Sequence, residues 1–188
     1  NPTDVNGINN IAGEAYHILY NNVYGIKATS LRLTNTFGPR HQMKHSKQGY
    51  LNWFIRLVLE NKKIQIYGDG KQQRDFNYVD DVVDALLLAG ASDKSNGEVF
   101  NLGTNEPISV LDSLKSIIKT AKKGSYELIP FPAEKKAIEV WDYYADYSKI
   151  KNMLGWEPKI SFEDGLARTI EFFEKFKEYL KEKGFYTA

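Results

Sequence analysis

The stretch Ile66-Tyr67-Gly68-Asp69-Gly70, followed by Arg74-Asp75-Phe76-Asn77-Tyr78-Val79-Asp80-Asp81, decides the fold class of this sequence. A short strand ends at the Gly-Asp-Gly turn, and a second extended run leads directly into a helix. That helix is apolar on nearly every side, so we expect it to be buried on nearly every side. We also expect Asp80 or Asp81 to cap this helix and Gly90 to end it.

The alternation of strands and helices continues on both sides of this stretch. The pattern predicts strands over residues 27–33, 63–67, 74–79, 98–102 and 126–130. It predicts helices over residues 8–24, 50–60, 79–90, 109–121 and 147–154, and a last helix from Ser161 with an apolar stripe of Phe162, Leu166, Ile170, Phe173 and Leu180. Strands separated by helices predict an α/β fold with parallel strand pairing.

Composition excludes several classes of protein. The 188 residues carry a formal net charge of +1, which gives no overall field to attract nucleic acid or an anionic membrane surface. There is no cysteine, so disulfides and thiolate metal sites are excluded, and no histidine–carboxylate cluster has metal-ligand spacing. We see no apolar run long enough to span a membrane and no secretory signal, and expect a soluble cytoplasmic protein.

Two polar residues stand where ligands bind in α/β proteins. Asn35 follows a predicted strand and precedes a Gly38-Pro39 turn, and Arg74 follows the Gly-rich turn. An amide can bind a sugar or a phosphate, and a guanidinium fork suits a diphosphate. The plainer alternatives are that Asn35 only caps its turn and that Arg74 only pairs with Asp75 or Asp80.

Three weaker features leave alternatives open. Gly103 follows a strand and would permit a positive φ or a close backbone approach. The aromatic run over residues 141–147 suits either base stacking or packing against the core, and the net charge argues against nucleic acid. His41 and His45 share a loop with Lys44 and Lys47, which would either meet phosphate or be solvated.

Together these segments resemble the extended short-chain dehydrogenase/reductases, in particular the NAD-dependent nucleotide-sugar epimerase/dehydratase family of the UDP-glucose 4-epimerase-like group. The markers that carry the resemblance come in the family's order, and it covers essentially the whole chain. They are Asn6-Gly7 with Asn10 and Gly13-Glu14, then Arg32, Asn35 and Gly38-Pro39, the stretch from Ile66 to Asp81, Asn101-Leu102-Gly103, and Leu154-Gly155-Trp156-Glu157-Pro158.

The resemblance implies the C-terminal portion of such a fold. Residues 1–38 and 74–103 would be the second half of a Rossmann-like parallel sheet. Residues 39–73 and 104–188 would form the smaller substrate-binding domain. The Gly-x-x-Gly-x-x-Gly turn of the dinucleotide site is absent from the 188 residues, so we expect NAD to serve the complete protein and not to bind this chain tightly. An exposed sheet edge or apolar face is then expected where the missing units would dock.

The resemblance also implies roles for individual residues. Asn35 and Arg74 would bind the diphosphate of a nucleotide-sugar, most simply a UDP-sugar. Gln65 and Tyr67 would lie along the base, on the strand over residues 64–67. Leu33 and Thr34 would lie near the nicotinamide. A homodimer, formed through the first predicted helix, is the expectation from the family.

The family's Tyr-x-x-x-Lys pair is substituted in this sequence. The catalytic Tyr position holds Asn6, and the Lys position, which also holds the cofactor ribose, holds Asn10. An amide cannot exchange a proton near neutral pH as a tuned phenol does. A second diphosphate-binding Arg of the family is replaced by Ala137. Two hypotheses therefore stand: the C-terminal portion of an epimerase or dehydratase, and a non-catalytic nucleotide-sugar-binding relative.

Overall fold

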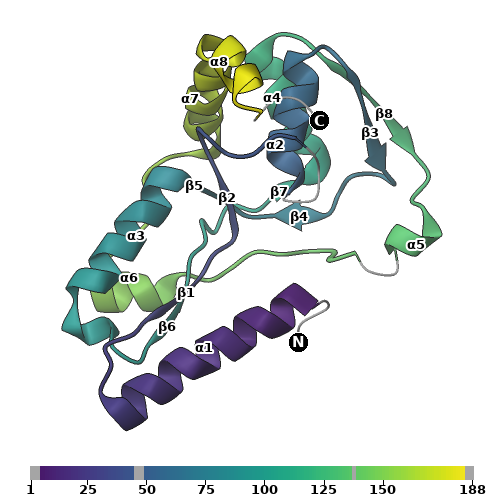
Figure 1. Cartoon of the computed structure of the whole chain (residues 1–188). Coiled ribbons are helices and arrows are strands. Elements are labelled where there is room, and N and C mark those ends of the chain that lie inside the picture. The colour runs from purple at the N-terminus through teal and green to yellow at the C-terminus, as the bar shows by residue number, and fades with distance from the viewer. Residues whose placement is uncertain (1–4, 45–48, 137–138, 185–188) are drawn as a thin grey trace.

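The computed structural model describes residues 5–44, 49–136 and 139–184 and has an α/β architecture (Figure 1). The helices are α1 (Val5–Tyr24), α2 (Tyr50–Leu59), α3 (Val79–Ala91), α4 (Val110–Ala121), α5 (Ala133–Lys136), α6 (Ser148–Leu154), α7 (Phe162–Lys175), α8 (Lys177–Glu182) and the 3-10 helix η2 (Asp93–Ser95). The strands are β1 (Ser30–Arg32), β2 (Asn35–Phe37), β3 (Lys63–Tyr67), β4 (Gln73–Arg74), β5 (Phe76–Tyr78), β6 (Val99–Asn101), β7 (Ile108–Ser109) and β8 (Ser125–Ile129).

Strand pairing is mainly parallel, as predicted. β1 pairs with β6, β2 with β5 and β3 with β8, all parallel, whereas the short β4 and β7 pair antiparallel. In the second pair Asn35 lies opposite Phe76, so the two segments singled out from the sequence lie side by side. The α/β prediction is confirmed, although β1 is shorter than the predicted strand.

Two apolar clusters form the interior. The larger one is built mainly from α2, α4, α7 and the strands around them, and contains Phe37, Ile55, Ile64, Ile66, Phe76, Leu114, Ile117, Leu166 and Phe173 among its buried residues. The smaller one joins α3, β6 and α6 and contains Val82, Ala85, Phe100, Leu102, Ile150 and Trp156. These side chains supply the burial that fixes the helices against the strands.

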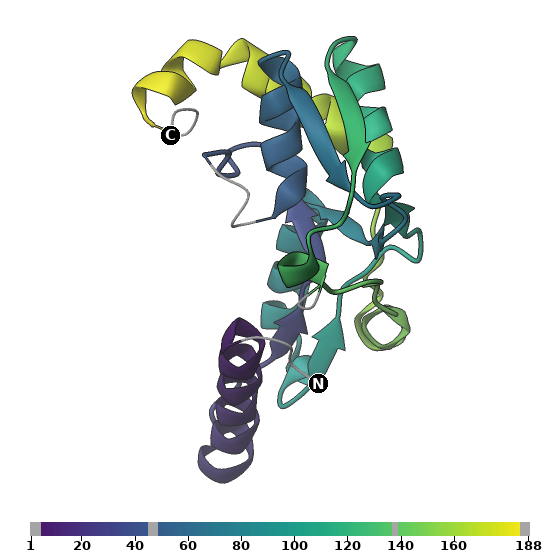
Figure 2. The ribbon, with the colours of Figure 1, turned by 90° about the vertical axis from the view of Figure 1, so that its right-hand side faces the viewer.

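Helix α1 lies at one end of the molecule, opposite α7 and α8 (Figures 1 and 2). None of its residues is buried, and its apolar side chains Ile8, Ile11 and Leu19 are each at least half exposed. A bidentate ion pair joins it to β1, with Arg32 Nε and Nη2 at 2.8 and 2.6 Å from the carboxylate of Glu14. The helix therefore presents a long uncovered apolar face.

Helix α3 corrects two expectations. Its side chains Val83, Leu86 and Leu87 are 45, 52 and 68% exposed, so the helix is not buried on nearly every side. Neither aspartate caps it, because the N-cap residue is Tyr78 and makes no side-chain capping bond. The buried Asp81 instead accepts a hydrogen bond from the backbone N–H of Ile160 at 3.0 Å and so anchors the segment before α7. The exposed apolar face that the resemblance led us to expect is therefore observed on α3.

The other helix ends follow the sequence closely. Ser109 and Ser161 cap α4 and α7, each accepting the N–H of the residue three positions later. Helix α3 runs one residue past Gly90, and the predicted last helix breaks at Phe176 into α7 and α8, with Leu180 buried on the second piece. No helix in the described ranges is long and apolar enough to cross a membrane.

Candidate nucleotide-sugar site

Three of the predicted substrate residues line one cavity of about 270 Å³, which we call the Arg74 cavity. Gln65 and Tyr67 reach it from β3 and Arg74 from β4. The remaining wall is formed by Tyr50, Trp53, Phe54, Ile66, Gln72, Val110, Phe131, Lys135 and Glu139. The strand–turn–strand geometry of the Gly-rich stretch thus brings the predicted base-binding and diphosphate-binding residues together.

Arg74 is engaged by the segment that follows α5. Its Nη2 donates to Glu139 Oε1 at 2.5 Å, and its Nη1 donates to the backbone oxygens of Gln73 and Trp141 at 2.8 and 3.0 Å. Both ionic side chains are largely buried, at 13 and 24% exposed. A pairing with Asp75 or Asp80 was the plainer alternative for Arg74, but its partner is Glu139, 65 residues further along the chain.

Aromatic rings and a second cation complete the Arg74 cavity. The rings of Tyr67 and Phe131 lie 5.5 Å apart between centroids, and Phe131 lies 5.8 Å from Trp141. Lys135 Nζ donates to the hydroxyl of Tyr67 at 2.7 Å. The cavity therefore offers flat apolar surfaces beside two cations, a combination that suits an anion attached to a planar heterocycle.

A neighbouring cavity of about 330 Å³, which we call the Asn35 cavity, contains the other predicted positions. Leu33, Thr34 and Asn35 line it, together with Thr36, Phe37, His41, Gly49, Tyr50, Leu51, Asn52 and Phe76. Asn35 is the first residue of β2, at the amino end of that strand, and its Nδ2 donates to the backbone oxygen of Asp75 at 3.1 Å. Thr34 is buried, with its hydroxyl donating to Asn77 at 2.7 Å.

The start of α2 opens on the Asn35 cavity. Its N-cap residue Gly49 makes no side-chain capping bond. In the described part of the chain, Thr36 Oγ1 and Asn52 Oδ1 are buried without a hydrogen-bond partner. An uncapped helix N-terminus beside unsatisfied polar atoms favours an anionic or hydroxyl-bearing ligand. His41 contacts Asn52 here, Nδ1 to Nδ2 at 2.5 Å, and burial lowers the pKa of its imidazole.

Tyr50 joins the two cavities because it lines both. Its hydroxyl lies 3.2 Å from Ser113 Oγ, and burial raises its pKa to about 12. The phenol therefore stays protonated near neutral pH and serves as a hydrogen-bonding group, not as a base. Residue types alone did not single out Tyr50, although its place directly after Gly49 at a helix start was a usable signal.

Asp75 is the main structural residue beneath the site, and the sequence did not reveal this. It is fully buried and accepts hydrogen bonds from the N–H and hydroxyl of Thr104 and from the N–H of Ala145. Gly103 is needed beside it, because a Cβ there would lie 2.2 Å from the oxygen of Ala145. Of the two reasons expected for Gly103, close approach is therefore confirmed, and a positive φ is not observed.

Comparison with known proteins identifies the family. Residues 1–103, more than half of the chain, match the model of the "NAD dependent epimerase/dehydratase family". This chain belongs to the NAD-dependent epimerase/dehydratase family. A UDP-glucose 4-epimerase of Mycolicibacterium smegmatis is 32% identical over 176 residues, covering 92% of this chain and 54% of that protein.

Solved structures of family members superpose well on this chain. A UDP-glucose 4-epimerase of Thermotoga maritima with UDP-glucose is 36% identical, with a TM-score of 0.80 over 91% of this chain and 53% of that one. A UDP-glucuronic acid 4-epimerase of Bacillus cereus, in complex with UDP-glucuronic acid and NAD, is 28% identical, with a TM-score of 0.80 over 94% and 54%. The chain thus spans about half the length of the relatives it matches, which agrees with the predicted C-terminal portion.

Asn6 and Asn10, where the resemblance places the family's Tyr and Lys, are not among the residues that line the two cavities. Both are exposed on α1, four residues apart. Their amides carry no charge and transfer no proton, and the hydroxyl of Thr34 is already bonded to Asn77. Leu33, which is 42% exposed, would offer only an apolar surface to a nicotinamide. The described residues therefore do not fit the family's way of holding and using NAD.

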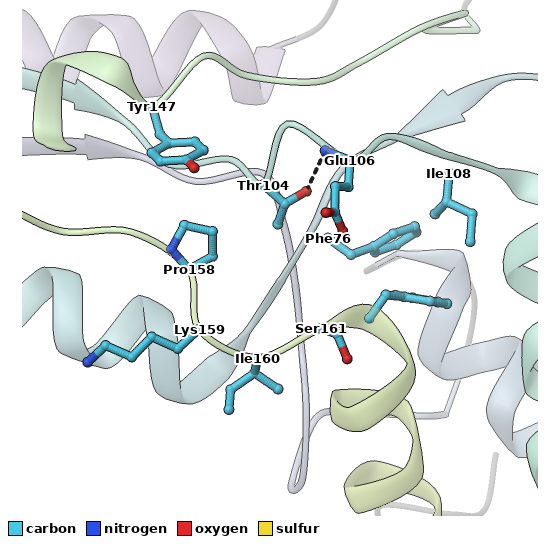
Figure 3. Close-up of a pocket in the computed structure, with 10 residues that line it drawn as sticks. Phe76, Thr104, Glu106, Ile108, Tyr147, Pro158, Lys159, Ile160 and Ser161 are labelled. Carbon is cyan, nitrogen blue, oxygen red and sulfur yellow. Dashed lines mark hydrogen bonds between the residues drawn. The ribbon is translucent and has the colours of Figure 1, made fainter.

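Figure 3 shows a third cavity, which shares the lining residue Phe76 with the Asn35 cavity. It measures about 280 Å³ and is lined by Thr104, Glu106, Ile108, Tyr147, Pro158, Lys159, Ile160, Ser161 and Phe162. Lys159 turns away from it and pairs with Asp84 at 3.3 Å. This cavity contains none of the residues predicted to bind ligand.

Some predicted positions lie outside the described residues, namely Ala137, His45 and Lys47. Within the described ranges, no group of three or more histidine and carboxylate side chains is placed to hold a metal ion.

Proposed function

We propose that this chain is the C-terminal, nucleotide-sugar-binding portion of an NAD-dependent epimerase/dehydratase acting on a UDP-sugar. The observation that carries the proposal is the grouping of Gln65, Tyr67 and Arg74 around one cavity that also holds Lys135 and two aromatic rings. Relatives of known structure hold UDP-sugars, among them the epimerases of Thermotoga maritima and Bacillus cereus.

In this proposal the two cavities hold different parts of one ligand. The nucleoside occupies the Arg74 cavity, where Tyr67 offers a stacking surface and Arg74 and Lys135 supply positive charge. The diphosphate passes Tyr50 toward the uncapped start of α2, and the sugar lies in the Asn35 cavity among hydrogen-bonding side chains. NAD would supply hydride transfer in the complete protein, and no residue described here takes the role of proton acceptor.

The substitutions at Asn6 and Asn10 favour a second candidate function. A family member that lacks both the phenol and the ammonium would bind nucleotide-sugar without turning it over. The binding site proposed above is unchanged in this case, because neither amide reaches either cavity. The two candidates therefore differ in catalysis and agree on binding.

Titration of the chain with UDP-glucose, UDP and NAD tests the proposal. We expect weak binding of UDP and UDP-glucose, no binding of NAD, and loss of UDP binding in Arg74→Leu. A matched control is Arg168→Leu, which removes an exposed guanidinium outside both cavities. Tight binding of NAD would contradict the proposal. So would a UDP affinity that is the same in Arg74→Leu as in the wild-type chain.

We further propose that the protein forms a homodimer through the uncovered apolar face of α1 and works in the cytoplasm. The support is the exposure of Ile8, Ile11 and Leu19, whose burial against a partner copy would be favourable. Sedimentation velocity on the chain and on Ile11→Lys tests the dimer, which the charged substitution should weaken.

A further inference from the structure

Gln72 has a buried side chain whose carbonyl oxygen, Oε1, is unsatisfied. The residue is 8% exposed, and Oε1 has no hydrogen-bond partner in the described part of the chain. A buried polar group without a partner costs about 1–3 kcal/mol, so its retention calls for a partner from outside the chain.

The position of Gln72 points to the ligand that would satisfy it. It lines the Arg74 cavity together with Arg74, two residues further along extended backbone, whereas the intervening Gln73 does not line this cavity. Residues two apart in an extended chain project to the same side. The side chains of Gln72 and Arg74 therefore face the same cavity.

The chemistry of the cavity narrows the class of ligand. Tyr67 and Phe131 offer ring faces, while Arg74 and Lys135 offer positive charge. A carboxamide presents one acceptor beside N–H donors, and the imide edge of uracil presents an N–H donor beside carbonyl acceptors. These two edges can form a pair of hydrogen bonds that satisfies Oε1.

We propose that Gln72 recognises the nucleobase, its Oε1 accepting the imide N–H of a uracil or thymine ring and its Nε2 donating to the adjacent carbonyl. The inference rests on the proposed function, because it places the nucleoside in the Arg74 cavity. The inference adds Gln72 as a residue that makes the site prefer nucleotides whose base has a free imide N–H.

The test compares UDP with UDP methylated at the imide nitrogen, using ligand-observed NMR on the chain and on two variants. For the wild-type chain we expect methylation to weaken binding about tenfold, the usual cost of losing such a buried hydrogen bond. Gln72→Leu should bind UDP as weakly as the wild-type chain binds the methylated ligand and should no longer discriminate. Gln73→Leu, a matched control of the same size one position away, should discriminate like the wild-type chain.

Equal binding of the two ligands by the wild-type chain would overturn the inference and needs no variant to fold. So would a Gln72→Leu chain that still discriminates, or one that is more stable with unchanged affinity for UDP, as expected if only a buried water satisfies the amide. If the wild-type chain binds no UDP at all, the proposed function itself fails, which is a different result from binding without discrimination.

Discussion

Arg74 and Glu139 form an ion pair of 2.5 Å inside the cavity that we assign to the nucleoside. The carboxylate of Glu139 neutralises the guanidinium of Arg74, which we propose attracts the diphosphate. An incoming diphosphate must therefore share Arg74 with Glu139 or displace it.

The first prediction concerns this competition. Replacing Glu139 with Gln removes a negative charge beside Arg74, so UDP should gain affinity relative to uridine, which has no phosphate. We expect the ratio of the two dissociation constants to shift in favour of UDP by roughly fivefold, on the order of 1 kcal/mol. Isothermal titration of both ligands measures the ratio, and an unchanged ratio would show that Glu139 does not oppose the diphosphate.

The second prediction concerns the support beneath the site. Asp75→Asn replaces a fully buried carboxylate that receives hydrogen bonds from Thr104 and Ala145. It should lower the free energy of unfolding by about 2–4 kcal/mol, because charge-assisted buried bonds are lost and an amide N–H meets a donor. Asp93→Asn is the control, since the side chain of Asp93 is 82% exposed and its partners, Lys27 and Asn96, meet it at the surface. Equal effects in urea denaturation would refute the role given to Asp75.

The third prediction concerns pH. Burial lowers the pKa of His41 below the value of about 6.5 that it has in the unfolded chain. As pH falls from 7 toward the folded pKa, the unfolded chain binds more protons than the folded one, so stability falls. His41→Gln should flatten the dependence of the unfolding free energy on pH below about 6.5. A slope that is the same in His41→Gln as in the wild-type chain would be evidence against this account.

The fourth prediction concerns catalysis. In a fusion of residues 1–188 to the first half of a relative such as the Mycolicibacterium smegmatis epimerase, Asn6→Tyr with Asn10→Lys should create or raise UDP-sugar epimerase activity. The double change restores a phenol that can exchange a proton and an ammonium that can lower its pKa. Coupled-assay rates measure the gain, and Asn9→Lys, which places the charge one position away, is the control. If the restored pair does not raise the epimerase rate, catalysis depends on residues other than those at positions 6 and 10.

Much of the fold followed from local pattern. The capping serines Ser109 and Ser161, the Gly-Asp-Gly turn and the bounds of β3 were correct because each depends on a few neighbouring residues. The burial of α3 was predicted wrongly. The sequence pattern indicates which of its residues are apolar, but it does not indicate whether another element packs against them. Leu86 and Leu87 remain exposed in a chain that spans half of its relatives.

The site was predictable only in part. Gln65, Tyr67 and Arg74 belong to one strand–turn–strand unit and line one cavity, whereas Asn35, predicted to share the diphosphate with Arg74, lines the neighbouring one. Glu139 and Phe131 reach the same cavity from more than fifty residues away, and no local pattern encodes that approach. The role of Asp75 also depends on distant partners, because Thr104 and Ala145 come from separate loops.

The most direct test of the central claim is a backbone NMR map of the chain titrated with UDP to millimolar concentrations. The account predicts shift changes that saturate together and centre on Gln65, Tyr67, Gln72 and Arg74, extending through Tyr50 to Asn35. Saturating changes confined to the third cavity, around Glu106 and Ser161, or no changes at all, would contradict it.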